Sequence, residues 1–196
     1  MIKTYRVSLV LPLLLAVSVQ AEEPSLETNI TAEEQKEGAL AFQDIYKVLL
    51  HPRCMNCHPA GDAPLQGEDS RPHRMNISRS STEAGLECAA CHQVHNSESY
   101  GVLDGPPGAP NWHLPDREMP LIFEGRTPAQ LCEQLKNPAK NGNHSLSELV
   151  EHVTYDPLVL WGWNPGADRS HPPLAHADFA RQFARWAELG GPCPVE

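Results

Sequence analysis

Four of the six cysteines occur in two identical frames, Cys54-Met55-Asn56-Cys57-His58 and Cys88-Ala89-Ala90-Cys91-His92. Each frame reads Cys-x-x-Cys-His, the pattern that attaches a c-type haem, because two thiols three positions apart can reach the two vinyl groups of a porphyrin. One such pentapeptide is expected by chance roughly 0.01 times in a chain of this composition. Two copies therefore predict two covalently bound haem c groups, with Cys54, Cys57, Cys88 and Cys91 as attachment residues and His58 and His92 as proximal iron ligands.

Other chemistries also use cysteine pairs. A thioredoxin-like pair belongs to a βαβ pattern, and neither frame follows an apolar strand. Four thiolates could hold zinc, but a zinc site does not require a histidine directly after each second cysteine. The two cysteines outside the frames, Cys132 and Cys193, are candidates for a separate disulfide, because exported proteins usually oxidise spare cysteines.

The first 21 residues predict a cleaved signal peptide. Lys3 and Arg6 precede an apolar run over 7–19, and a small-x-small site ends at Ala21. The run is short for a bilayer and is broken by Pro12, although an uncleaved anchor is the alternative. We expect cleavage near Ala21, a periplasmic or otherwise exported protein, and no membrane span in the mature chain.

The composition is that of one globular domain with long loops. The 196 residues include 15 Lys and Arg against 25 Asp and Glu, a formal net charge of −10, together with 19 Pro and 13 Gly. An acidic chain repels phosphate backbones, which argues against nucleic acid and favours a cationic protein partner. A core of apolar side chains alone would be thin unless something else fills it.

Helix signals lie on both sides of a long irregular stretch. A capping box at Thr31 predicts a helix that Pro52 stops, and a capping box at Ser145 predicts a helix to about 153. The pair Thr127-Pro128 predicts a third helix that runs to about 136. The closing helix, 174–189, has one apolar face and ends at two glycines. Between 59 and 120 no long periodic segment appears, so a haem there would serve as the core.

With both frames and the signal peptide in view, the chain resembles exported di-haem c-type cytochromes. The resemblance implies a mainly α fold, with cytochrome c-like helices and long irregular loops wrapped around two covalently attached haems. It also implies that the closing helix packs on the opening one. The expected organisation is a signal peptide over 1–21, a flexible leader over 22–30 and a single di-haem domain over 31–196.

A second resemblance rests on shorter stretches. These stretches are Gly108-Ala109-Pro110, Leu131-Cys132, Asp156-Pro157-Leu158 and Trp161-Gly162-Trp163. They look similar to small cytochromes labelled as subunits associated with isoquinoline 1-oxidoreductase. This resemblance implies a molybdenum hydroxylase-type dehydrogenase as the electron donor. The two tryptophans are expected to pack on a haem edge or in the core.

The motifs leave the distal ligand of each iron open, and methionine and histidine are the usual choices. Met119, which precedes Pro120 as in small cytochromes c, and Met75 are the methionine candidates. Among the histidines we favour His152, which Glu148 could orient from one helical turn away, and His73, which lies close to Met75. Arg117, Arg126 and Arg169 are candidate partners for the haem propionates.

These residues predict an electron-transfer protein rather than an enzyme. Two haems would relay single electrons between redox partner proteins, from an exported or membrane dehydrogenase to a downstream acceptor. The alternative is a di-haem redox enzyme, of the peroxidase or sulfur-compound oxidase type, in which one iron keeps an open sixth position.

Overall fold

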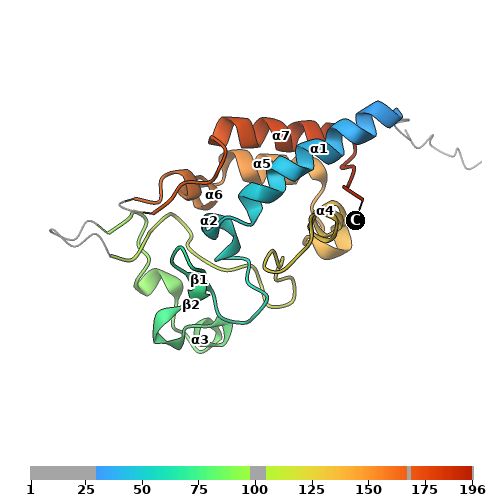
Figure 1. Cartoon of the computed structure of the whole chain (residues 1–196). Coiled ribbons are helices and arrows are strands. Elements are labelled where there is room, and N and C mark those ends of the chain that lie inside the picture. Colours follow the sequence, from blue (N-terminus) through green and yellow to red (C-terminus); the bar gives the residue numbers. More distant parts are fainter. Residues whose placement is uncertain (1–29, 98–104, 167–168, 196) are drawn as a thin grey trace, which may run out of the picture.

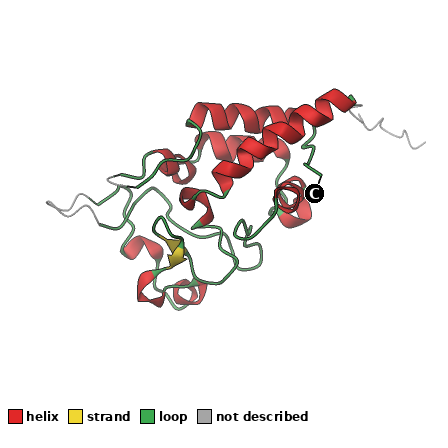
Figure 2. Cartoon of the chain, viewed as in Figure 1, coloured by secondary structure: helices red, strands yellow, loops and turns green. Residues whose placement is uncertain are grey.

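The computed structural model describes residues 30–97, 105–166 and 169–195. The expected signal peptide and most of the expected leader lie outside these residues. The described chain is mainly helical, as predicted, with one two-stranded antiparallel sheet, β1 (Leu65–Gln66) and β2 (Arg71–Pro72). Figures 1 and 2 show the longer helices gathered in one half of the molecule and the loops and short elements in the other.

The helical half is built on α1 (Ala32–Leu49), which packs against α7 (His176–Glu188). Helix α5 (Leu146–Tyr155) lies against α7, and α4 (Pro128–Lys136) lies against α1 (Figure 1). Capping boxes at Thr31, Thr127 and Ser145 begin α1, α4 and α5. The opening and closing helices thus pack together, as the cytochrome resemblance implies.

The apolar faces of these helices form the core. Phe42 of α1 contacts Trp186 of α7 with ring centroids 5.2 Å apart, and both side chains are fully buried. All four residues of the predicted α7 face are buried, namely Phe179, Phe183, Trp186 and Leu189. Gly190 and Gly191, at φ of 75° and 69°, end the helix because the left-handed region suits glycine.

Helix α1 ends at Leu49, just before Pro52, as predicted. The same proline also begins a second short helix that was not predicted, α2 (Pro52–Met55). Proline suits the first position of a helix, where its missing N–H has no partner to lose, and the side chain of His51 caps the turn. Helix α2 therefore presents Cys54 directly at the end of α1.

A disulfide joins Cys132 of α4 to Cys193 near the C-terminus, with their Cα atoms 5.5 Å apart. Cys132 is fully buried in the helical core. The bridge therefore fastens the segment after α7 onto α4. Among the described residues Cys54, Cys57, Cys88 and Cys91 are free thiols.

The other half of the chain is a succession of short elements. It contains the sheet, α3 (Arg79–Glu83) and the 3₁₀-helices η1 (Arg74–Asn76) and η2 (Cys88–Ala90). Later connections are η3 (Pro138–Lys140), α6 (Pro157–Leu160) and η4 (Trp161–Trp163). Figure 2 shows that irregular backbone dominates this half.

Candidate functional site

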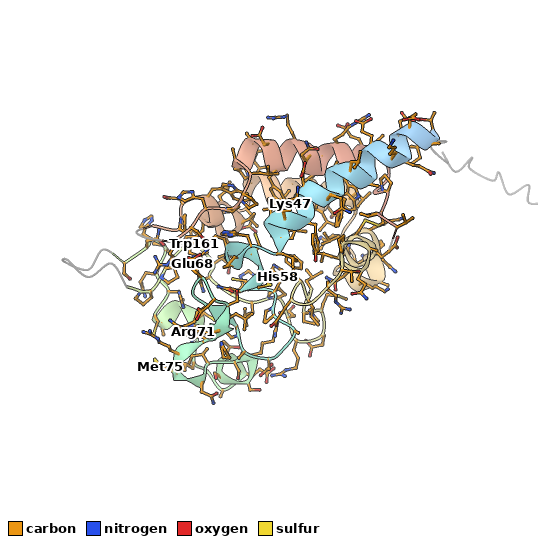
Figure 3. All side chains as sticks on the ribbon, in the orientation of Figure 1. Lys47, His58, Glu68, Arg71, Met75 and Trp161 are labelled. Carbon is orange, nitrogen blue, oxygen red and sulfur yellow. A yellow bond between two sulfur atoms is a disulfide. The ribbon has the colours of Figure 1, made fainter. Side chains whose placement is uncertain are left out.

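The first motif lies where the two halves meet. Helix α2 carries Cys54, and the following turn carries Cys57 and His58. Both cysteines keep some exposed surface, but desolvation by the surrounding protein raises the pKa of Cys54 to about 12 and that of Cys57 to about 11. The thiols are therefore neutral in apolar surroundings. Figure 3 shows His58 at the centre of the molecule, between the helical layer and the loops.

His58 is held by a segment more than sixty residues away. Its Nδ1 lies 2.8 Å from the carbonyl oxygen of Leu121. A carbonyl only accepts hydrogen bonds, so Nδ1 carries the proton and Nε2 carries the lone pair. The ring stacks on Phe123 with centroids 3.9 Å apart and planes 9° apart. Burial lowers the pKa of His58 to about 4, which keeps the imidazole neutral.

The second motif repeats this arrangement with unrelated partners. His92 Nδ1 lies 2.7 Å from the carbonyl oxygen of Pro107, and its ring stacks on Trp112 at 4.5 Å with planes 1° apart. Burial again lowers the pKa of His92. Cys88 is half-buried and Cys91 is exposed. Both motif histidines therefore offer a neutral Nε2 and rest against an aromatic ring.

A network of polar contacts fixes the loop that carries Pro107. Asn96 Oδ1 accepts from the backbone N–H of Gly108 at 3.1 Å and from the indole N–H of Trp161 at 2.8 Å. Trp161 in turn meets Trp112 edge to face at 4.8 Å. A Cβ on Gly108 would lie 2.2 Å from the carbonyl oxygen of His95, so only glycine fits this approach.

The two tryptophans of η4 thus serve different parts of the molecule. Trp161 belongs to the wall beside the second motif, and it also lies 5.9 Å from the guanidinium carbon of Arg53. Trp163 contacts Phe179 at 5.3 Å and belongs to the helical core. Figure 3 shows Trp161 near Glu68, the carboxylate that accepts a hydrogen bond from Arg53.

Cys57 of the first motif and Cys88 of the second lie within electrostatic range of each other, although 31 positions separate them in the chain. Desolvation raises the pKa of Cys57 most, and the proximity of Cys88 raises it further.

The methionine candidates lie differently from each other. Met75 is 83% exposed, has a φ of 63° and projects at the outer edge of the loop half in Figure 3. Met119 is half-buried, with its Cγ 3.8 Å from where a Cβ on Gly142 would lie, close to His144. It lies two residues before Leu121, whose carbonyl oxygen contacts His58.

The histidine candidates have their Nδ1 atoms engaged. His152 is about half-exposed, and its Nδ1 lies 3.1 Å from an Asp156 carboxylate oxygen. The sequence predicted Glu148 as the carboxylate that orients His152, but that carboxylate is Asp156. Glu148 instead caps the start of α5 together with Ser145. His152 and Asp156 line an open cavity of about 380 Å³. His73 lies beside the second motif, its ring centroid 6.0 Å from that of His92.

Two of the three propionate candidates are engaged elsewhere. Arg117 pairs with Asp62 and Glu83, and Arg169 donates to the carbonyl oxygens of Pro165 and Gly105.

Two buried arginines, which the sequence reasoning missed, have free donors instead. Arg53 is 7% exposed and pairs with Glu68, but its Nε has no partner among the described residues. Arg79 is 6% exposed and donates to the carbonyl oxygens of Pro115 and Gly61, while its Nη2 has no partner in the part of the chain that the structure describes. Only the position of Arg53 directly before Cys54 was a signal in the sequence.

No family model, curated protein or solved structure matches this chain. In the described ranges, no three or more His, Cys, Asp or Glu side chains are grouped to hold a metal ion. Over the same residues, no helix has the length and apolarity needed to cross a bilayer.

Proposed function

We propose that this chain is an exported electron-transfer protein that carries two covalently bound haem c groups. The observation that supports this most directly is the shared setting of the two motif histidines. In each motif a backbone carbonyl accepts a hydrogen bond from the Nδ1–H, at 2.8 Å for His58 and 2.7 Å for His92, and an aromatic ring stacks on the imidazole. This orients a neutral Nε2 for iron, as hydrogen bonds to metal-ligating histidines do.

The buried polar atoms around the motifs suit a haem. A guanidinium taken out of water is costly unless an anion compensates it. Of the described residues, no carboxylate forms an ion pair with Arg79, whose Nη2 is buried and free. Its charge also contributes to the lowered pKa of His58, so it lies near that ring. The carboxylate of a haem propionate is an anion of the right kind for this position.

The cysteines would supply the covalent bonds. Each S–H adds across one vinyl group: a carbon–sulfur bond forms, the C=C π bond breaks, and the thiol hydrogen goes to the neighbouring vinyl carbon. The neutral thiols of Cys54 and Cys57 lie in apolar surroundings suited to a porphyrin edge. When bound, the haem iron supplies a one-electron couple between Fe(III) and Fe(II).

The partner would be a redox protein with a cationic docking face, since this chain carries a net charge of −10. The resemblance to cytochromes associated with isoquinoline 1-oxidoreductase suggests a molybdenum hydroxylase-type dehydrogenase as donor. We expect the rate of reduction by such a donor to fall as ionic strength rises, because salt screens the attraction between opposite charges.

The test is to express the full chain in a host that exports it and has haem-maturation machinery. Intact mass and a pyridine haemochrome assay should show two haems per chain, and voltammetry should show two reversible one-electron waves. The C54A/C57A and C88A/C91A variants should each lose one haem. The matched control, C132A/C193A, also removes two cysteines but should keep both haems.

Absence of haem from the wild-type chain would overturn the proposal. Two haems with a high-spin ferric signal in the wild type would instead favour the di-haem enzyme, because high-spin iron shows an open or weakly held sixth position.

A further inference from the structure

His73 stands opposite the second motif in a fixed position. It lies between β2 and η1, and its backbone N–H donates to the carbonyl oxygen of Pro64 at 2.9 Å. Its ring centroid is 6.0 Å from that of His92, with the ring planes inclined at 60°. The two residues come from separate short elements, so the hairpin that contains β2 brings His73 to this place.

Both rings are in the form that binds iron through Nε2. The Nδ1 of His73 lies 2.6 Å from the carbonyl oxygen of Arg74, and that of His92 lies 2.7 Å from the carbonyl oxygen of Pro107. Since a carbonyl only accepts, the neutral form of each ring carries its proton on Nδ1 and its lone pair on Nε2. Two lone pairs cannot hydrogen-bond to each other, so the rings have no direct polar contact through these atoms.

The separation of the rings suits a shared metal ion. An imidazole nitrogen binds a first-row metal at about 2.0 Å, and the ring centre lies about 1 Å further along the same line. Two imidazoles on opposite sides of one ion therefore have centroids roughly 6 Å apart. The rings that stack directly in this protein are closer, 3.9 Å for His58 on Phe123 and 4.5 Å for His92 on Trp112.

We infer that His73 is the distal ligand of the iron whose proximal ligand is His92, so that the second haem is bis-histidine. This inference rests on the proposed function. The neighbouring candidate, Met75, has a side chain that is 83% exposed, so it does not face the second motif from a buried position. Histidine in place of methionine lowers the reduction potential. Ligation by His73 therefore gives the second haem a lower reduction potential than ligation by Met75 would give it.

The experiment compares three variants of the full-length holoprotein. His73→Ala removes the ligand, Met75→Leu removes the rival thioether, and His171→Ala removes an exposed histidine as the matched control. Haem stoichiometry is measured in each, followed by ferric EPR and a potentiometric titration. We expect two haems in all three proteins, and in His73→Ala alone we expect one of the two irons to become high-spin. Added imidazole should restore that iron to low spin.

A fourth variant covers the case in which His73→Ala folds poorly. His73→Met keeps a ligand at the position, so it should hold both haems, raise one of the two potentials and add the near-infrared band of Met-ligated ferric haem. Unchanged spin states and potentials in both His73 variants would overturn the inference, and a change in Met75→Leu instead would assign the ligand to Met75. A wild type without haem would overturn the proposed function itself, which is a separate result.

Discussion

Removing the disulfide should cost a large part of the stability of this protein. The bridge joins Cys132 to Cys193 across 61 positions. In the chain-entropy model, closing a loop of this length restricts the unfolded chain and contributes about 4 kcal/mol to the free energy of unfolding. For a chain of this size, that corresponds to a fall in Tm of about 8 to 16 °C.

The assay is guanidinium denaturation of the holoprotein, followed by tryptophan fluorescence and by absorbance in the Soret region. The Cys132→Ala/Cys193→Ala variant is compared with wild type before and after reduction by dithiothreitol. The variant and the reduced wild type should agree to within about 1 kcal/mol, because both lack the same cross-link. Since Cys132 is fully buried, a variant much less stable than the reduced protein would measure a packing defect instead.

A fall of less than about 1 kcal/mol in both proteins would refute the reasoning. It would mean that the segment after α7 stays in place without the bridge, through contacts with α7 such as the hydrogen bond from the Trp186 indole N–H to the carbonyl oxygen of Pro192, 3.1 Å long.

Three further predictions concern the walls of the two motifs. Gly108→Ala places a Cβ 2.2 Å from the carbonyl oxygen of His95, so the loop carrying Pro107 must shift. We expect the free energy of unfolding to fall by about 1 to 3 kcal/mol and the potential of the second haem alone to change. An unchanged potential of the second haem would contradict this prediction. Phe123→Ala removes a 5% exposed ring stacked on His58 and should cost about 3 to 5 kcal/mol, with broadened EPR features of the first haem as the spectroscopic check. Arg79→Met removes a buried positive charge near His58. Because a nearby positive charge favours Fe(II) over Fe(III), the potential of the first haem should fall in this variant, and Arg79→Lys should restore part of the loss. Equal potentials in the two variants would argue against a propionate at Arg79.

The helices were predictable because their signals are local. Thr31 and Ser145 cap helices in the structure as their side chains and those three residues later indicate, and Thr127 caps one as the following Pro128 indicates. The predicted end of α1 before Pro52 is confirmed, but helix α2 was not predicted, because only the path of the backbone after Leu49 shows that the same proline begins another helix. The predicted partner of His152 was wrong, since carboxylates lie one turn away on both sides, at Glu148 and Asp156.

The sequence by itself predicted an attachment chemistry for the two motifs and determined the start and end of the four longer helices, because these signals depend on residues within about one helical turn of one another. The tertiary structure decided what surrounds the motifs. The carbonyl of Leu121 holds His58 from 63 positions away, and His73 meets His92 through a hairpin. Arg79 is buried with no carboxylate partner within residues 30–97, 105–166 and 169–195, and no local pattern in the sequence marks it. Contacts of this kind depend on how loops without periodic structure are folded against each other, and that is set by packing across the whole molecule.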